Sequence, residues 1–221
     1  MKQDLFEEWN ERMVSKYDIE TYYSASNPII KYIERRRIDC LVKLLSPREN
    51  EKIFEVGCGA GHVLQNIHLG QLYAIDLSSR MLSLAKKRLG DKVELKQCNA
   101  ESLVYADNFF DRTVCTEVLE HTLNPQKVIC EIARVSKPGG VVILSIPNED
   151  LINKCKDILV KMIIFKVFFK NIPEKNEWHL HNFSLPILRS MTKDVLKEIE
   201  IKAIPNRFFP LRYVGKYKVV K

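Results

Sequence analysis

Three glycines at alternate positions, Gly57, Gly59 and Gly61, are the feature that most constrains this chain, because they lie between an apolar run and a helical pattern. Glycine has no Cβ, so such a segment can turn sharply after a strand and let a ligand approach the backbone closely. A strand, a glycine-rich turn and a helix form the first unit of an open α/β sheet. The segment therefore predicts a ligand pocket at the end of a strand, with a tight turn that binds nothing as the alternative.

The chain on both sides of this turn repeats the alternation of strand and helix. Short apolar runs predict strands, and the amphipathic stretches between them predict helices. The pattern indicates an α/β fold, a Rossmann-like doubly wound sheet that is mostly parallel. The strands are expected at Lys52–Val56, Leu72–Ile75, Val93–Gln97, Arg112–Cys115 and Val141–Ile146, and the helices at His62–His68, Ser79–Leu89 and Pro125–Val135.

Proline and glycine mark further boundaries. Pro28 is expected to open a helix that runs to Leu45, and the three arginines at 35–37 within it are interpreted as solvated surface. Residues 137–140, Lys-Pro-Gly-Gly, are expected to stop the preceding helix and turn the chain before the fifth strand.

The C-terminal region predicts a helix over Pro186–Glu198 and two strands, Ile199–Ile204 and Arg212–Val220. We expect these as antiparallel C-terminal strands at or near the edge of the sheet. The chain is expected to form a single domain over residues 1–221. Its parts are a helical N-terminal arm or lid (1–46), a cofactor-binding core (47–148), a helical substrate-side insert (149–183) and a C-terminal helix with strands (184–221).

Composition and charge narrow the class of protein. The chain is 46% hydrophobic and 29% charged, which is enough apolar surface for a sizeable core. Six cysteines are never closer than fifteen residues, so we interpret them as reduced intracellular thiols. The N-terminal segment is acidic where a secretory signal is basic and then apolar, which predicts a cytoplasmic location. A net charge of +7 without a recognition motif predicts no nucleic-acid partner.

Leu151–Lys170 is the richest apolar stretch, but it carries lysines at 154, 156, 161, 166 and 170. A lysine at the centre of a membrane span costs roughly 2.5–3.5 kcal/mol, so this segment is not expected to cross a bilayer. Three roles stay open for it: a lid over the substrate, a dimer contact, or a peripheral contact with the inner membrane face in which the lysines reach the headgroups. The oligomeric state is not predicted.

Asp76 ends the second strand about twenty residues after the glycine segment, where an acid can accept hydrogen bonds from both hydroxyls of a ribose. The two features together predict a cofactor that contains a nucleoside. A dinucleotide site needs its third glycine where this chain has His62, so the spacing disfavours a pyrophosphate. Glu55 adds a negative charge that suits a cationic ligand instead.

These motifs resemble the class I S-adenosylmethionine-dependent methyltransferases of small-molecule type, from about Glu51 to Asn148. The resemblance implies that residues 55–61 surround the methionine part of S-adenosylmethionine, that Asp76 binds the ribose, and that residues 99–101 meet the adenine. Asn99 stands where the family usually has Asp, but an amide can both accept from and donate to an adenine. The cofactor-binding residues implied in this way are Glu55, Gly57, Cys58, Gly59, Gly61, Asp76, Leu77, Met81, Asn99, Ala100, Glu101 and Thr116.

Residues 116–121 follow the fourth strand and match the family's next motif. Glu117, Glu120 and His121 would leave that strand at its carboxyl end, where open α/β sheets bind ligands. His121 is a candidate base, because the pKa of a free histidine lies near working pH, and a role in ordering the loop is the alternative. These three residues could also hold a divalent cation, but we expect no metal.

The segment after the insert is loosely similar to quinone O-methyltransferases, which act on lipid-tailed phenols. It contains His179 and His181, which would face the same way on an extended segment and could act as base or orient the acceptor. A hydrogen-bonded pair in a loop is the alternative. The candidate catalytic residues are therefore His121, Glu117 and His179.

The sequence thus predicts a methyltransferase that moves a methyl group to O, N or C of a small, lipophilic acceptor. An NAD(P)-dependent oxidoreductase is an alternative that the glycine spacing disfavours. A regulatory protein that binds the cofactor without turnover is a second alternative. A nucleic-acid methyltransferase is a third, but the Asn-Pro-Pro-Tyr type of signature is missing.

Overall fold

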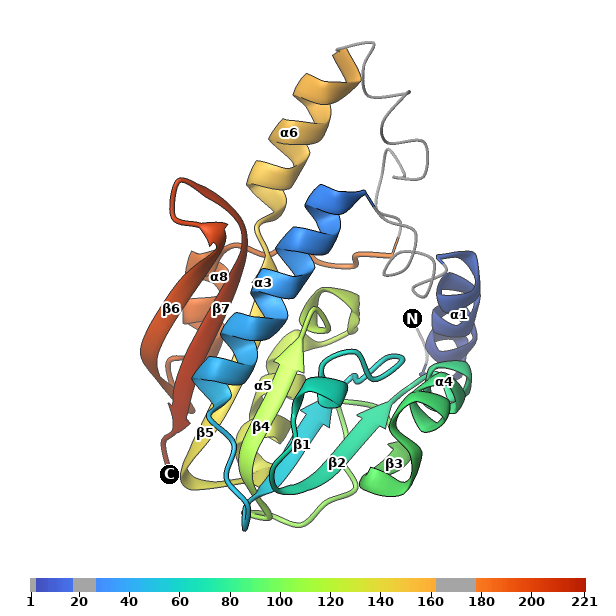
Figure 1. The fold of residues 1–221 in the computed structure, drawn as a ribbon, viewed down its shortest axis with the longest axis vertical. Helices are drawn as coiled ribbons and strands as arrows, with labels where there is room; N and C mark the ends of the chain where they lie inside the picture. Colours follow the sequence, from blue (N-terminus) through green and yellow to red (C-terminus); the bar gives the residue numbers. More distant parts are fainter. Residues whose placement is uncertain (1–2, 18–26, 162–177) are drawn as a thin grey trace.

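The protein is described here from a computed structural model that covers residues 3–17, 27–161 and 178–221. Seven strands form one sheet in the order β3-β2-β1-β4-β5-β7-β6 (Figure 1). The pairs among β1 to β5 are parallel, and β7 is antiparallel to both of its neighbours, which confirms the predicted Rossmann-like sheet. The strands are β1 Lys52–Val56, β2 Gln71–Asp76, β3 Val93–Gln97, β4 Phe110–Thr116, β5 Ser136–Pro147, β6 Leu196–Asn206 and β7 Phe209–Val219.

Helices cover both faces of the sheet. Buried side chains of α3 and α4 pack on one face, and those of α5 and α8 pack on the other. The helices are α1 Gln3–Lys16, α3 Pro28–Leu45, α4 Ser79–Leu89, α5 Pro125–Val135, α6 Glu149–Lys161 and α8 Leu185–Thr192, with short 3-10 turns η1 Leu64–Asn66, η2 Gly90–Lys92 and η3 Leu119–His121.

Adjacent residues of β1 show how the two layers arise. Ile53 is fully buried on the face that contains Leu41 of α3. Phe54 is fully buried on the opposite face, in the cluster that contains Ile132 of α5. Side chains alternate along a strand, so a strand buried on both faces must be apolar at nearly every position. This is why a short continuous apolar run was a reliable sign of the central strands.

Polar residues set the helix starts that the sequence predicts. The Asn27 side chain accepts from Ile29 N–H just before Pro28 opens α3. Ser78 accepts from Met81 N–H at the start of α4, which leaves Asp76 free of that capping role. A capping side chain satisfies one of the backbone N–H groups that a helix end leaves without a partner.

The predicted helix at His62–His68 is wrong, because the structure forms only the 3-10 turn Leu64–Asn66 there. The Gln65 and Asn66 side chains donate to the carbonyl of His62, at 3.2 and 2.9 Å. Amide side chains that bond the local backbone compete with the helical pattern. A seven-residue segment also gains too few helical hydrogen bonds to offset the cost of nucleation.

The predicted helix Pro186–Glu198 is too long at its C-terminal end. Helix α8 stops at Thr192, and β6 begins at Leu196, opposite Val219 of β7. Pairing along the whole of β7 therefore overrides the local helical pattern of these residues. Both C-terminal strands are longer than predicted, and β6 forms the outer edge of the sheet.

Residues 137–140 do not turn the chain before the fifth strand. Strand β5 already begins at Ser136, which pairs with Phe110 before the register shifts. Gly139 has φ +71° within this irregular stretch, a backbone conformation that glycine adopts without strain. The glycines thus permit a bulge inside the strand.

Helix α6 provides the first part of the predicted helix Leu151–Lys170, and residues 162–177 lie outside the described part of the chain. The predicted N-terminal helix is found as α1. None of the helices within the described residues is long and apolar enough to span a membrane.

Tyr217 of β7 offers a test of how the edge of the sheet is packed. Its side chain is fully buried, and among the described residues its hydroxyl has no hydrogen-bond partner. Removing a buried hydroxyl that lacks a partner removes only its desolvation cost, so Tyr217→Phe should leave the free energy of unfolding unchanged or raise it by about 1 kcal/mol. Tyr217→Ala should lower it by roughly 3–5 kcal/mol through the cavity it creates. Urea unfolding measures both, and a clear loss of stability in Tyr217→Phe would contradict this packing.

Candidate active site

The glycine segment after β1 requires glycine for two reasons. Gly57, Gly59 and Gly61 all have positive φ, at +69°, +50° and +82°. A Cβ on Gly57 would lie 2.4 Å from a methyl carbon of Val118, and one on Gly61 would lie 2.8 Å from Leu89. A Cβ on Gly59 would meet no atom of the described residues within 4 Å. The loop is thus held tightly at its two ends and open at its centre, as a loop that accommodates a ligand must be.

Asp76, at the end of β2, connects this loop to the next strand. One carboxylate oxygen accepts from Gly59 N–H at 2.8 Å and the other from Ser78 N–H at 2.9 Å. Burial raises the pKa of Asp76 to about 6, against the opposing effect of these two hydrogen bonds. Each carboxylate oxygen can accept a second hydrogen bond, so both keep capacity for a ligand hydroxyl.

Glu55 lies just before the loop and is 2% exposed. Burial raises the pKa of Glu55 well above its usual range, and the positive charge of Arg37 opposes this rise. Its Oε2 atom has no hydrogen-bond partner among the described residues. A buried carboxylate oxygen without a partner is costly, and a cationic ligand group would satisfy it.

Arg37 corrects the interpretation of residues 35–37 as solvated surface. It is 2% exposed, and its guanidinium lies 2.9 Å from the Glu34 carboxylate. Helical periodicity could have revealed this, because Arg37 is four residues from both Ile33 and Leu41, which are buried on the same helix.

Cys58 contributes its backbone to the loop. Its N–H donates to the Ile75 carbonyl at 2.9 Å, and its carbonyl accepts from Gly61 N–H at 2.9 Å. Burial, together with the nearby charges of Asp76 and Glu55, raises the pKa of the Cys58 thiol well above its usual range. The thiol is therefore protonated and unreactive.

The loop after β3 lies beside the end of β2. Cys98 N–H donates to the Asp76 carbonyl at 3.1 Å, and the Asn99 side chain accepts from Glu101 N–H at 2.8 Å. The Glu101 carboxylate accepts from Asn124 N–H at 2.9 Å, which ties this loop to the start of α5. The partly buried Ala100 packs against the core. The structure thus gives Glu101 a structural contact, and a contact of this loop with adenine stays a prediction.

Two further residues assigned to the adenine, Leu77 and Met81, lie between the end of β2 and the first turn of α4. The Leu77 carbonyl accepts from the Gln97 side chain at 3.0 Å. Met81 is 3% exposed and forms a small apolar cluster with Val14 of α1 and Ala60. Met81 therefore contacts the glycine loop, and α1 covers its side chain.

Helix α1 lies against the start of α4 (Figure 1). The Glu11 carboxylate accepts from Ser79 N–H at 2.8 Å and from the Ser78 hydroxyl at 2.9 Å. The ring of Tyr17, just after α1, stacks on Trp178 with 5.9 Å between centroids. The predicted N-terminal arm thus contacts both the start of α4, which follows Asp76, and Trp178, which precedes His179.

Glu117 follows Thr116, the buried last residue of β4, and has φ +54°. One oxygen of Glu117 accepts from the Ser145 hydroxyl at 2.7 Å, and the other accepts from Arg212 Nε at 2.9 Å. Arg212 also pairs with Glu34 at 3.0 Å. A network of charges therefore fixes Glu117 between β5, β7 and α3.

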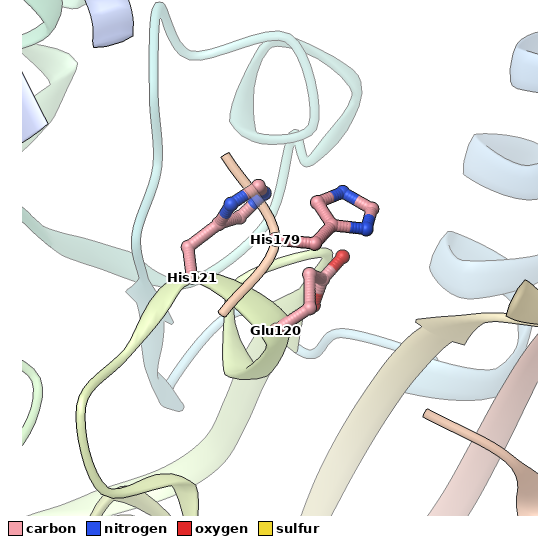
Figure 2. Close-up of side chains that lie close together, drawn as sticks. All are labelled: Glu120, His121 and His179. Carbon is pink, nitrogen blue, oxygen red and sulfur yellow. The ribbon is translucent and has the colours of Figure 1, made fainter. Parts of the chain in front are cut away.

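Glu120, His121 and His179 form a second cluster, in which one donor atom of each lies within 4.8 Å of the others. Figure 2 shows the three side chains gathered at one point, two of them from the turn after β4. His121 Nδ1 is 3.1 Å from the Trp178 carbonyl, and His179 Nδ1 contacts the Glu149 carboxylate of α6. Imidazole and carboxylate donors suit a divalent transition cation, so among the described residues it is this cluster, and not the set of Glu117, Glu120 and His121 considered from the sequence, that could hold such an ion.

Backbone contacts dock the segment around His179 onto this turn. Leu180 N–H donates to the Glu120 carbonyl at 2.8 Å. His181 Nε2 lies 2.9 Å from the Thr122 carbonyl, so His179 and His181 have separate partners and do not form the hydrogen-bonded pair considered above. No sequence signal could have placed His179 next to His121, because the intervening chain is long.

Burial separates the roles of these groups. It lowers the pKa of His121 to about 3, and the neighbouring His179 adds to this effect. Burial also raises the pKa of Glu120 well above its usual range, with a further contribution from Glu117. His121 is therefore neutral at working pH and a weak base, whereas His179 differs from it in having the Glu149 carboxylate as its partner.

The fold and this site together define a class. A Rossmann-like sheet with a glycine loop after β1 and an acid at the end of β2 is the arrangement that binds nucleoside-containing cofactors. Residues 54–144 match the family model described as a methyltransferase domain.

Named relatives point to the same family. The ubiquinone biosynthesis O-methyltransferase of Dechloromonas aromatica is 36% identical over 120 residues, which are 52% of this chain and 51% of that protein. The demethylmenaquinone methyltransferase of Halalkalibacterium halodurans is 27% identical over 201 residues, 81% and 82% of the two chains. The fold also resembles the N-methyltransferase NodS of Bradyrhizobium japonicum in complex with S-adenosyl-L-homocysteine, with a TM-score of 0.65 and 18% identity over 88% of this chain and 89% of that one.

Over residues 54–144, which are less than half of its length, the chain is therefore similar to methyltransferase domains. It spans about half the length of the first curated relatives it matches. These matches give no support to the oxidoreductase or to the regulatory protein considered above.

The low pKa of His121 has a measurable consequence. The unfolded chain binds a proton at this residue below about pH 6.5, whereas the folded chain does so only near pH 3, so the stability that depends on neutral His121 should fall as pH falls through this window. His121→Gln should flatten that dependence. Urea unfolding from pH 4 to pH 7 would show it, with a chelator present in both samples. An imidazole NMR titration of His121 with a midpoint above pH 5 would contradict the assignment.

Proposed function

We propose that this protein transfers the methyl group of S-adenosylmethionine to a small, lipophilic acceptor. The observation that carries the proposal is the pair of acids at the glycine loop: the partly buried Asp76, held by Gly59, and the buried Glu55, with one oxygen lacking a partner among the described residues. The names of the relatives favour a quinone-type acceptor with a lipid tail. The methyl group is transferred to O, N or C of this acceptor.

The residues present fit this cofactor. Asp76 would accept from the ribose hydroxyls with the lone pairs that Gly59 and Ser78 leave available. Glu55 would accept from the ammonium group of the methionine part, which would also lower the raised pKa of this carboxyl. Asn99, together with Met81, would border the adenine.

The chemistry asks little of the protein beyond alignment. S-adenosylmethionine, when bound, supplies a methyl group on a positively charged sulfur that is already a good leaving group. The residues around the site must hold the acceptor atom within roughly 3–3.5 Å of the methyl carbon, on the line of the breaking bond, and keep water out. Trp178 and the end of α1 are placed to exclude water, because Tyr17 stacks on Trp178, and Trp178 packs against the apolar cluster that contains Val14 of α1 and Ala60 of the loop.

An acceptor that carries a proton also needs a base. We assign this role to His179, because the Glu149 carboxylate contacts its Nδ1 and would stabilise the imidazolium that forms. His121, neutral and oriented by the Trp178 carbonyl, would hydrogen-bond the acceptor. Glu117 would keep this turn in place through Ser145 and Arg212.

A lipid-tailed acceptor also requires contact with a membrane. We propose that the insert 151–170 makes a peripheral contact at the inner membrane face. The support is its sequence, apolar with interspersed lysines. Residues 151–161 of this insert belong to α6, and residues 162–170 lie outside the described part of the chain.

The direct test is to incubate the protein with S-adenosylmethionine labelled in the methyl group and with fractionated cell lipids and soluble extract. A labelled, lipid-soluble product is expected. Heat on mixing with S-adenosylmethionine but no labelled product from any fraction would favour a cofactor-binding protein without turnover.

Asp76→Ala should weaken binding of S-adenosylmethionine by about 1–3 kcal/mol, the usual cost of leaving buried polar groups without a partner. The matched control is Asp91→Asn, which changes an almost fully exposed carboxylate near the end of α4. Isothermal titration calorimetry measures both. Unchanged affinity in Asp76→Ala would contradict the ribose assignment.

His179→Gln should lower turnover by about a hundredfold or more while cofactor affinity stays the same, as expected for loss of a general base. His68→Gln, at an exposed position, is the control and should have full activity. The readout is the initial rate of product formation at several pH values. If the variant keeps more than half of the normal rate, His179 is not the base.

A further inference from the structure

The tip of the β6–β7 hairpin exposes two adjacent aromatic side chains. Phe208 is 82% exposed and Phe209 is 44% exposed. The tip is held in a defined conformation, because the Asn206 side chain accepts from the N–H groups of both phenylalanines, at 2.9 and 3.0 Å. Scattered apolar side chains on a surface are ordinary, but two neighbouring aromatics on an ordered, protruding turn suggest a contact.

The first turn of α3 adds more apolar surface at the same end of the molecule. Ile29 is 61% exposed and Tyr32 is 57% exposed. Helix α3 packs along β6 and β7, and the Glu34–Arg212 ion pair joins it to the hairpin. Figure 1 shows the start of α3 and the hairpin tip at the same end of the molecule. We call these four exposed side chains, Ile29, Tyr32, Phe208 and Phe209, the apical surface.

The charges around the apical surface are mostly of one sign. Its exposed basic side chains are Lys31, Arg35, Arg36 and Arg207. The chain from Ile201 to Lys221 contains no Asp or Glu, and Glu34 is buried in its ion pairs. Asp39 of α3 and Asp150, at the start of α6, are exposed acids among the described residues of these two helices. The Arg207 guanidinium lies 4.7 Å from the centre of the Phe208 ring, so charge and aromatic surface form one unit.

We propose that the apical surface docks on a lipid bilayer that contains anionic lipids. Aromatic side chains with flanking arginines and lysines are the combination that binds the boundary between headgroups and acyl chains. A protruding turn offers no groove for a peptide or a small ligand, but a bilayer accepts a protruding group. The hairpin contact is separate from the insert 151–170, because it uses different residues on a different element.

Docking through the apical surface would also orient the candidate active site relative to the bilayer, and this part of the inference rests on the proposed function. Arg212 of the hairpin holds Glu117 at the end of β4, and the Asn148 side chain donates to the Pro210 carbonyl at 2.8 Å. The apical surface and the carboxyl ends of the central strands are therefore joined by direct contacts. Docking would place the acceptor side of the site toward the bilayer, from which a lipid-tailed acceptor comes.

The test is sedimentation of the full chain with phosphatidylcholine vesicles, with and without phosphatidylglycerol. Wild type is expected to bind the anionic vesicles more strongly than the neutral ones. Replacing both phenylalanines (Phe208→Ser with Phe209→Ser) should weaken binding about tenfold, as expected for loss of two inserted aromatic side chains. The matched control is Val104→Ser, which removes a 65% exposed apolar side chain beside the C-terminal half of α5 and should bind normally.

The charge requirement has its own pair of variants. Arg207→Glu should weaken binding to anionic vesicles by about fivefold or more, whereas Lys87→Glu on α4 should have little effect. In Phe208→Trp, the indole fluorescence should shift to the blue when anionic vesicles are added.

Two results would overturn the proposal: wild type that does not bind anionic vesicles, or equal binding by wild type and the double phenylalanine variant. Equal binding would assign the contact to another segment. Calorimetry with S-adenosylmethionine on every variant separates this outcome from failure of the proposed function, because the substituted residues lie outside the glycine loop that is proposed to bind the cofactor. Loss of vesicle binding with intact cofactor binding supports the proposal, whether or not an acceptor is found.

Discussion

The hydrogen bond from Gly59 N–H to the Asp76 carboxylate is the interaction on which the site depends. It joins the turn after β1 to the end of β2, and glycine at position 59 adopts the φ of +50° found there without strain. The same carboxylate accepts from Ser78 and so fixes the start of α4. A single acid thus connects two strands and a helix around the space where the cofactor would lie, and burial raises its pKa as a consequence.

Two buried acids determine which ligand charge the candidate site favours. Glu55 and Glu120 are both almost fully buried, and the pKa of each is raised mainly by burial. Buried acids favour a ligand that brings positive charge, since such a ligand compensates the desolvation of the carboxylate. Arg212 and Arg37 compensate only part of this charge, because both also pair with Glu34. A sulfonium cofactor fits this balance better than a phosphate would.

The fold could be predicted where burial alone determines structure. β1, α4 and α5 have the predicted bounds, because strands buried on both faces and amphipathic helices leave strong patterns. The errors fall where contacts far along the chain compete with local preference. Leu196 belongs to a strand because β7 lies opposite, and residues 62–68 lose their helix to side-chain hydrogen bonds with the backbone. Arg37 was predicted to be exposed to solvent like the two arginines before it, but it is buried and pairs with Glu34.

The sequence by itself determined the sheet, the glycine loop and the acid at the end of β2, because each is a local pattern with one physical solution. The tertiary structure decided which side chains meet. Only the docked segment at residues 178–181 places His179 beside His121, and only the return of β7 brings Arg212 to Glu117. Such pairs depend on where distant segments come to rest, and the energy that fixes their place is spread over many contacts along both segments.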